Sequence, residues 1–303
     1  MTQSIRTPKN ETIAAASLEI VPVAGRIGAE IRGVKLGGDL DDETIAAITA
    51  ALVRHKVIFF RGQEHLDDAG HEAFAARMGE PLAHPTVPPS PGSTFLFPLD
   101  SKEGVPANEW HTDITFLPAF PAASILRAII IPPFGGDTLW ANTVAAYEEL
   151  TPPLKAMVET LTAVHTNAVD YAARHPDRSP GAVKESTSVF TSTTYETEHP
   201  VVHVHPVSGE RALLLGGFVK RLVGLRREDG EQIYRLLQDH ISRPEHTVRW
   251  RWAVGDVAIW DNRSTQHRAI ADYGDQHRRL RRATIAGQIT VGVDGRPSRA
   301  LGA

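Results

Sequence analysis

Three histidine–x–aspartate pairs in this chain have residue types and a spacing that can hold a metal ion. Side chains alternate between the two faces of a β-strand, so residues two positions apart point to the same side. One histidine from a distant strand completes a triad of two imidazoles and one carboxylate, which leaves positions on an iron ion open for chemistry. Zinc hydrolases use similar ligands, so a pair alone does not define the metal. The pairs are His65/Asp67, His111/Asp113 and His175/Asp177.

The surroundings of the three pairs differ and favour one of them. Asp67 stands where a helix needs an N-cap, which indicates a structural role for the first pair. The third pair flanks a proline in a polar segment, where no fixed geometry is expected. His111 and Asp113 lie in the segment 110–116, whose aromatic and β-branched residues predict a strand. A metal site is better built on such an element, so this pair is the candidate, against the alternative of a solvated polar pair.

The third ligand must be one of the other histidines, and the residues alone leave several open. His203 and His205 share one face of an expected strand, and His240 and His246 flank the end of an expected helix. His267 follows an expected strand and a short turn. By position alone, it is one candidate among these five.

A basic cluster lies downstream of His267. In a strand, Arg278 and Arg282 share one face, with about 13 Å between their Cα atoms, whereas Arg279 and Arg281 point the other way. A solvated edge strand that discourages aggregation explains this pattern. The alternative is a pair of anion receptors in one pocket, because the planar guanidinium group binds carboxylates and sulfate-like groups. Taken alone, the cluster favours the edge strand.

Composition limits the chemistry that the chain can carry. It has 303 residues and no cysteine, which excludes disulfides, thiolate metal sites and a cysteine nucleophile. The 32 basic and 36 acidic residues give a formal net charge of −4, so nucleic acid is not an expected partner. No apolar stretch approaches the about 18 residues of a membrane span. Residues 1–17 are polar and unlike a signal peptide, so we expect a flexible leader and a cytoplasmic protein.

Hydrophobic periodicity predicts a mainly β protein with added helices. Many short strands with Gly/Pro turns indicate a sandwich or barrel, and we expect one domain over residues 18–303, a jelly roll with helices outside it. The segments 81–108 and 170–192 are long polar loops that could close over a substrate as lids. Strands are expected at 18–23, 29–34, 57–60, 110–116, 124–131, 138–141, 201–205, 211–215, 247–252, 256–261 and 283–290, and helices at 41–54, 69–78, 143–150, 152–161 and 228–241.

Three motifs resemble those of the TauD/TfdA family of Fe(II)- and 2-oxoglutarate-dependent dioxygenases. They are WHTDITF at 110–116, GGDTLWAN at 135–142 and GDVAIWDNRSTQH at 255–267. The resemblance runs from about residue 18 to about residue 293 and implies a double-stranded β-helix, a jelly roll. It also implies that Fe(II), 2-oxoglutarate and O₂ take part in the reaction. By the resemblance, His111, Asp113 and His267 bind iron, Arg278 and Thr138 bind 2-oxoglutarate, and Arg282, His84, the backbone N–H of Ile114 and Phe218 bind the primary substrate.

Within the family, the chain resembles the bacterial alkylsulfatase branch, especially over 24–34, 54–63 and 189–200. Val87 replaces a tyrosine of the taurine enzymes, and Ala107 replaces an asparagine. These changes make a roomier and more apolar site, which suits an alkyl chain behind an anionic head. The expected reaction hydroxylates the carbon that bears a sulfate ester and releases an aldehyde and inorganic sulfate. We expect His84 to assist most as a protonated imidazole, because a neighbouring sulfate favours that form.

Three other functions stay open from the sequence. A dioxygenase of taurine or alkanesulfonates would release sulfite, and a dioxygenase of aryloxyacids would bind a carboxylate. A jelly-roll protein that holds a metal without catalysis would have no need of Arg278 and Thr138. The resemblance also implies a homodimer or homotetramer, with a small alkyl sulfate or sulfonate as the only other expected partner.

Overall fold

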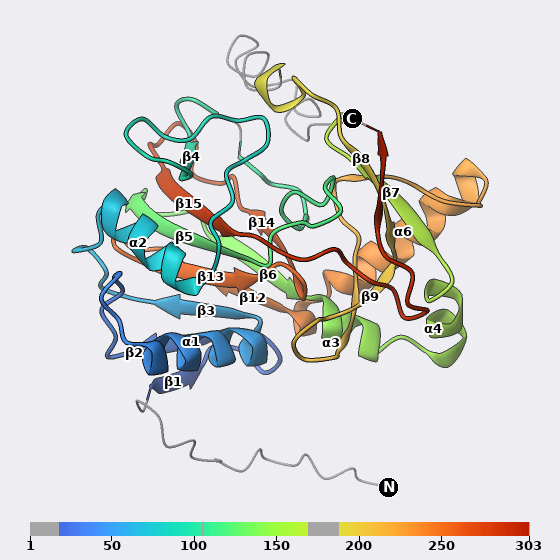
Figure 1. Cartoon of the computed structure of the whole chain (residues 1–303), viewed down its shortest axis with the longest axis horizontal. Coiled ribbons are helices and arrows are strands. Elements are labelled where there is room, and N and C mark those ends of the chain that lie inside the picture. The colour runs from blue at the N-terminus through green and yellow to red at the C-terminus, as the bar shows by residue number, and fades with distance from the viewer. Residues whose placement is uncertain (1–17, 105, 169–187, 303) are drawn as a thin grey trace, which may run out of the picture.

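The computed structural model describes residues 18–104, 106–168 and 188–302. In these residues β-strands are the main regular structure, arranged as a seven-stranded sheet and three smaller sheets (Figure 1). The strands are β1 (Glu19–Pro22), β2 (Ala29–Arg32), β3 (Val57–Phe60), β4 (Phe97–Asp100), β5 (Ala123–Ile130), β6 (Thr138–Asn142), β7 (Thr162–Thr166), β8 (Glu196–Pro200), β9 (Val202–Val204), β10 (Arg211–Leu213), β11 (Val219–Leu222), β12 (Thr247–Trp250), β13 (Val257–Asp261), β14 (Thr265–Ala269), β15 (Arg279–Ile285) and β16 (Arg299–Gly302). The helices are α1 (Asp42–His55), α2 (Asp68–Met78), α3 (Thr143–Glu148), α4 (Pro152–Val158), α6 (Arg227–Ile241) and the 3-10 helix η2 (Pro244–His246).

The seven-stranded sheet has the order β1-β2-β3-β13-β5-β15-β4. The central strand β13 is buried throughout, and it separates two cores because its side chains alternate between the two faces of the sheet. Val257 and Ile259 pack into a core with residues of α1 and α2, which cover that face of the sheet (Figure 1). Ala258 and Trp260 pack on the other face against Trp140 of β6. The sheet therefore has helices on one side and a second sheet on the other.

The second sheet, in the order β12-β6-β14, forms the opposing wall of the jelly roll. Its strands pair in antiparallel register, with His267 opposite Trp140 and Ala269 opposite Thr138. Trp140 is fully buried, and its ring contacts those of Phe59 and Trp260 from the large sheet. The apolar side chains between the two walls fix the distance of β14 and β6 from β5 and β15, and so position the residues expected to react.

The predicted jelly roll and most predicted elements are confirmed. Helix α1 begins after the N-cap Asp41, whose side chain accepts from the backbone N–H of Thr44. Helix α2 begins after Asp67, which accepts from Gly70 N at 2.7 Å, so the first His-x-Asp pair has the predicted structural role. None of the four strands of the smaller sheet β11-β7-β8-β16 was predicted, because these strands are short and mix polar with apolar residues.

Several predicted elements are wrong. Residues 110–116 are not a strand: His111 makes a single bridge, and turns follow it. The positive φ of Ile114, 56°, ends any extended run there. The segment 81–108 is not all loop, since β4 pairs with β15 in its middle. The last predicted strand, 283–290, is displaced: β15 runs from Arg279 to Ile285, and its first half was missed because arginines interrupt the apolar alternation there.

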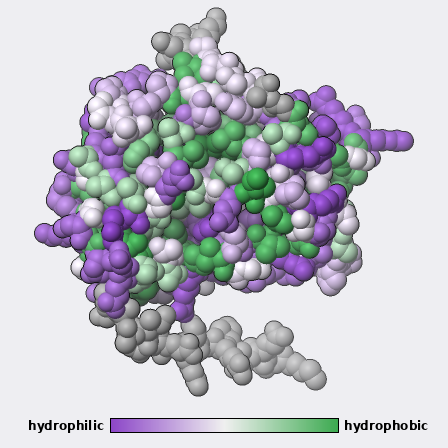
Figure 2. Space-filling model, in the orientation of Figure 1, coloured by the Kyte–Doolittle hydropathy of each residue, from purple (hydrophilic) through white to green (hydrophobic). Residues whose placement is uncertain are grey.

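Some sequence predictions concern parts of the chain outside the described residues. These are the leader at 1–17, the pair His175/Asp177 and most of the proposed lid at 170–192. On the face shown in Figure 2, hydrophilic residues gather toward the outline of the molecule and apolar residues toward its middle. No helix in the described ranges is long and apolar enough to cross a membrane.

Candidate active site

His111, Asp113 and His267 converge as a potential metal-binding triad. One ligand atom from each lies within 4.8 Å of the others, and all three side chains are buried. Oδ1 of Asp113 is 3.9 Å from Nε2 of His111 and 3.8 Å from Nε2 of His267. Within the described residues, no other three histidine or carboxylate side chains converge in this way. The spacing suits a single ion between the three atoms.

The backbone around the triad explains how residues so far apart in sequence meet. His111 N donates to His267 O at 3.0 Å, and His267 N donates to His111 O at 2.8 Å, so β14 holds the first ligand beside the third. Thr112 Oγ1 donates to Thr265 O at 2.8 Å and secures the next residue. Asp113 reaches the same point through the turn that follows. The period-two argument for a strand was therefore wrong, although the pair does converge.

Hydrogen bonds and charge prepare the triad for a cation. Nδ1 of His111 lies 2.8 Å from the backbone oxygen of Glu109, which requires a proton on Nδ1 and makes Nε2 the unprotonated nitrogen of the neutral ring. Burial lowers the pKa of His111 and, more strongly, of His267. Burial opposes ionisation of Asp113, but nearby groups, the charge of Arg282 foremost, outweigh it and lower its pKa to about 2. Two neutral imidazoles and one carboxylate are the donor set that Fe(II) oxygenases use.

Arg278 forms one end of the cavity next to the triad. Its Nε donates to Gly136 O at 2.9 Å, and its Nη2 lies 3.4 Å from Thr138 Oγ1. The side chain is 9% exposed, and no carboxylate pairs with it in the described residues. Burial lowers its pKa to about 10. A buried guanidinium group without a counterion fits a ligand that brings a carboxylate.

Gly136 makes room for that guanidinium group. Its φ is 70°, and a Cβ atom there would lie 3.0 Å from Cδ of Arg278 and 3.2 Å from Tyr273. The GGDT motif therefore carries glycine both for the turn and for the close approach of the arginine.

Arg282 lies at the other end of the cavity, next to His84. Its Nη1 donates to Asp113 Oδ1, and its guanidinium group lies 4.8 Å from the centre of the Phe97 ring. Its Nε is buried and has no partner in the described residues. Arg282 lines the cavity, and a guanidinium group that gives one nitrogen to Asp113 keeps further N–H groups with which to bind an anion. The solvated edge strand is thus excluded for this arginine, and for Arg278, while Arg281 lies near Asp68 on the helix-covered side of the sheet.

The hydrogen bonds of His84 are those of a neutral imidazole, whereas the role expected for it next to a bound sulfate was that of a protonated ring. Its Nδ1 accepts from the backbone N–H of Val87 at 3.0 Å and from that of Thr86 at 3.3 Å. An acceptor nitrogen carries no proton, so the proton of the ring is on Nε2. Burial and the charge of Arg282 lower the pKa of His84 to about 3. His84 therefore offers a single N–H rather than a positive charge.

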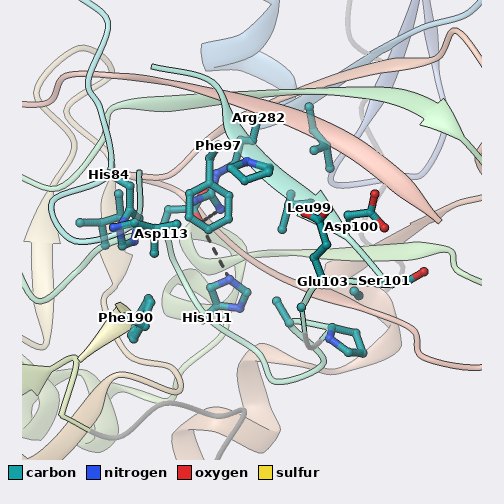
Figure 3. A pocket seen from close by; sticks show the side chains of 18 of the residues that line it. His84, Phe97, Leu99, Asp100, Ser101, Glu103, His111, Asp113, Phe190 and Arg282 are labelled. Atoms are coloured by element: carbon teal, nitrogen blue, oxygen red, sulfur yellow. Dashed lines mark hydrogen bonds and ion pairs between the residues drawn. The ribbon is translucent and has the colours of Figure 1, made fainter. Parts of the chain in front are cut away.

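Apolar and aromatic side chains line the wall of the cavity beyond Arg282. The cavity has a volume of about 750 Å³ and is lined by the triad, both arginines, Val87 and Ala107. Figure 3 shows His84, Phe190 and Arg282 grouped around His111 and Asp113. Three phenylalanines and one isoleucine form the cluster at this end, called the aromatic cluster below: Ile114, Phe116, Phe190 and Phe218. Val87, Leu117 and Tyr195 pack against it.

The other histidines considered as ligands have structural partners. His205 Nε2 lies 3.0 Å from Asp261 Oδ2, and His203 is buried next to Phe120. His240 Nε2 contacts the backbone oxygen of Ala146 at 2.8 Å. His246 contacts the backbone of His240 and the carboxylate of Glu149. None of these four belongs to the triad.

Some residues of the site were missed from the sequence. Phe97 and Tyr273 line the cavity but lie in segments without a recognisable motif. Phe190 also lines it and lies in the segment 189–200, whose resemblance to the alkylsulfatase branch was noted without a role for this residue. Ser124 donates to Asp113 Oδ2 at 2.7 Å. The sequence could have indicated Ser124, because it is a polar residue near the start of the apolar strand ASILRAII, and a buried hydroxyl there needs a hydrogen-bond partner.

Comparison with known proteins gives consistent similarities over nearly the whole chain. The model of the family described as "Taurine catabolism dioxygenase TauD, TfdA family" matches residues 19–284. An alpha-ketoglutarate-dependent sulfate ester dioxygenase of Pseudomonas putida is 60% identical over 285 residues, which are 94% of this chain and 95% of the relative. An alkylsulfatase of Acinetobacter baylyi is 52% identical over 295 residues, 97% of this chain and 91% of the relative. The crystal structure of a taurine dioxygenase from Burkholderia xenovorans is similar with a TM-score of 0.80 and 40% identity, covering 95% of this chain and 97% of the other.

Proposed function

Because the chain belongs to the TauD/TfdA family of 2-oxoglutarate-dependent dioxygenases, we propose that it oxidises alkyl sulfate esters at the carbon that bears the sulfate. The observation that carries the proposal is the cavity that joins a histidine–aspartate–histidine triad to two buried arginines and an aromatic wall. The relatives named as sulfate ester dioxygenase and alkylsulfatase, at 60% and 52% identity, support it.

The overall reaction converts an alkyl sulfate, 2-oxoglutarate and O₂ into an aldehyde, sulfate, succinate and CO₂. One oxygen atom enters succinate, and the other enters the C–H bond next to the ester oxygen. The resulting hemiacetal sulfate loses sulfate as its hydroxyl proton leaves, which gives the aldehyde. Fe(II), held by His111, Asp113 and His267, would supply the activation of oxygen when bound.

Arg278 and Thr138 would bind the distal carboxylate of 2-oxoglutarate. Arg278 has no acidic partner, and its Nε is already fixed by Gly136 O, so its terminal nitrogens are oriented before the ligand arrives. Thr138 Oγ1 accepts from Trp252 Nε1 at 3.0 Å, which fixes the hydroxyl at the same place. A preoriented fork of this kind binds a carboxylate with little further loss of entropy.

Arg282, His84 and the backbone N–H of Ile114 would bind the sulfate group. Arg282 supplies the charge, and His84 supplies a neutral N–H from Nε2. Ile114 is held in a left-handed conformation by its own turn, in which Leu117 N donates to Ile114 O at 3.1 Å. These donors stand next to the triad, so a sulfate bound there places its first carbon near the metal.

Phe218 and the rest of the aromatic cluster would hold the alkyl chain. An apolar chain gains about 0.8 kcal/mol for each buried CH₂ group. Val87 and Ala107 line the cavity without adding a hydroxyl or an amide, which favours a chain over a substrate that carries an ammonium group. Burial of the chain thus gives a physical reason for the preference over taurine.

An assay with two substrates tests the proposal. The purified protein is loaded with Fe(II) under anaerobic conditions and then given oxygen, 2-oxoglutarate and either a medium-chain alkyl sulfate or taurine. Succinate together with sulfate from the ester, with little turnover of taurine, is the expected result. Succinate together with sulfite from taurine would instead support the sulfonate reaction, to which the similarity with the taurine dioxygenase structure points. The homodimer or homotetramer and the cytoplasmic location stay predictions.

A further inference from the structure

A chain of hydrogen bonds runs from a buried tryptophan to the carboxylate of the triad. Trp260 Nε1 donates to Asn262 Oδ1 at 3.0 Å, and Asn262 Nδ2 donates to Ser124 Oγ at 2.9 Å. Ser124 Oγ then donates to Asp113 Oδ2 at 2.7 Å. Asn262 Oδ1 also lies 3.4 Å from the backbone N–H of Asp113. All four side chains are at most 2% exposed, so no water competes for these bonds.

The chemistry of the first residue fixes the direction of every bond in the chain. An indole N–H can only donate, so Trp260 requires the oxygen of the Asn262 amide to face it. The amide nitrogen therefore faces Ser124 and uses a lone pair of the hydroxyl. The one hydroxyl proton of Ser124 is left for Asp113. The chain thus delivers a donor, never an acceptor, to Oδ2 of the carboxylate.

The two oxygens of Asp113 consequently have different roles. Oδ2 is taken by Ser124, whereas Oδ1 is the oxygen that lies 3.9 Å from His111 Nε2 and 3.8 Å from His267 Nε2. Oδ1 also accepts from Arg282, which pulls it toward the same side. The carboxylate plane is therefore fixed from both ends.

We propose that Ser124 and Asn262 are positioning residues that hold Asp113 so that it binds the metal through Oδ1 alone. The inference rests on the proposed function, since it takes the triad as the metal site. A carboxylate that binds through one oxygen uses one position on the ion, whereas one that binds through both uses two. By donating to Oδ2, the hydroxyl of Ser124 keeps one coordination position on the ion open for 2-oxoglutarate or oxygen.

The sheet explains why a serine can do this without moving. Ser124 lies at the start of β5, with Trp260 of β13 opposite it on one side and Thr284 of β15 on the other. Its neighbours on the same face, Leu126 and Ala128, are apolar and buried. The position of the hydroxyl is set by the two flanking strands, and a rigid element of this kind orients a ligand better than a loop does.

Titration of the metal-free protein with Co(II) under anaerobic conditions, without 2-oxoglutarate or substrate, tests the inference. The visible absorption of Co(II) reports both its affinity and its coordination number. We expect Ser124→Ala to raise the Kd for Co(II) by about 10- to 100-fold, the usual effect of removing a partner of a metal ligand, and to change the absorption spectrum. Ser124→Thr keeps the hydroxyl and is expected to bind Co(II) with the affinity and spectrum of the parent protein.

Ser90→Ala is the matched control. Ser90 is 1% exposed, and its hydroxyl has no hydrogen-bond partner in the described residues, so its loss should leave Co(II) binding unchanged. Parent-like affinity and spectrum in Ser124→Ala would overturn the inference, as would equal losses in Ser124→Ala and Ser124→Thr, because packing would then be the cause. A parent protein that binds no Co(II) would contradict the proposed function itself, and the inference with it.

Discussion

His111 and His267 stand 156 positions apart in the chain, yet each donates its backbone N–H to the carbonyl oxygen of the other. The two imidazoles lie with ring centres 4.2 Å apart because the main chain pairs at this point, not because the side chains attract. Since β14 belongs to the wall that also contains β6, the position of both ligands depends on the packing of Trp140 between the two sheets. Ligand geometry is thus a property of the jelly roll itself.

This arrangement leads to a first prediction for His267→Ala. The main-chain pair with His111 is kept in the variant, so we expect the fold to persist and the metal and activity to be lost. Circular dichroism should be unchanged within error, while bound iron and succinate formation should fall below detection. Full activity in a folded variant would exclude the triad. Because His205 is equally buried but contacts Asp261 instead, His205→Ala serves as the control and should keep the metal site.

Replacing Arg278 and replacing Arg282 should weaken the binding of different substrates. Arg278→Ala is expected to raise the KM for 2-oxoglutarate, and Arg282→Ala the KM for the alkyl sulfate. A hydrogen bond to a charged group contributes about 1.5–3 kcal/mol, which corresponds to a change of about ten- to a hundredfold. Steady-state kinetics with each substrate varied in turn gives both constants. Equal increases for both substrates in either variant would refute the separate roles.

The neutral state of His84 gives a prediction for pH. If the ring bound sulfate as a cation, the affinity for alkyl sulfate would fall as pH rises through about 6.5. Nδ1 accepts two backbone N–H groups, and burial lowers the pKa of His84 to about 3, so the neutral form is already present throughout this range. We therefore expect the Kd of the alkyl sulfate to stay constant within about twofold between pH 6 and pH 8. A steady rise in Kd across that range would show instead that His84 binds the sulfate as a protonated ring.

The jelly roll, and the convergence of His111, Asp113 and His267 in one cavity with Arg278 and Arg282, could be predicted from apolar alternation and from motifs. Prediction from the sequence failed where the backbone departs from regular structure. The turn at Ile114 was read as a strand since β-branched and aromatic residues usually indicate one, but its φ of 56° depends on contacts made after folding. One such contact is the bond of Thr115 Oγ1 to His165 on β7, a residue 50 positions away. The tautomer of His84 likewise depends on the turn at 84–87 and could not be read from residue types.

Buried histidines outside the site should make the protein sensitive to acid. Burial lowers the pKa of His199 and of His203 to about 4, below the value of about 6.5 in an unfolded chain. The unfolded state therefore binds more protons than the folded state between these values, and stability falls as pH drops from about 6.5 toward 4. At about 1.4 kcal/mol per pH unit for each group, the two groups together lose about 7 kcal/mol between about pH 6.5 and about pH 4.

Urea unfolding at a series of pH values measures this loss. We expect the free energy of unfolding to be nearly flat between pH 7 and pH 8 and to decline steadily below pH 6.5. His203→Gln removes one of the two groups. Its free energy of unfolding should therefore fall with pH less steeply than that of the parent protein, by about 1.4 kcal/mol per pH unit, whatever the effect of the substitution at pH 7. An unchanged slope in His203→Gln would show that His203 is not responsible.

Val87 and Ala107 provide the sharpest test of substrate choice. Both line the cavity, and Val87 packs against the aromatic cluster of Ile114, Phe116 and Phe218. Replacing them together, Val87→Tyr with Ala107→Asn, adds a phenol and an amide where the alkyl chain is expected to lie. The larger side chains remove apolar volume from the cavity. A bound alkyl group would then cover the new phenol and amide without offering them hydrogen-bond partners, which costs about 1–3 kcal/mol for each buried polar group. We expect kcat/KM for a medium-chain alkyl sulfate to fall by at least about tenfold. The KM for 2-oxoglutarate, whose proposed site is at Arg278, should stay the same. Kinetics with alkyl sulfates of increasing length measures the effect, which should grow with chain length. A uniform loss for all lengths would mean that the two positions act on the sulfate end rather than on the chain.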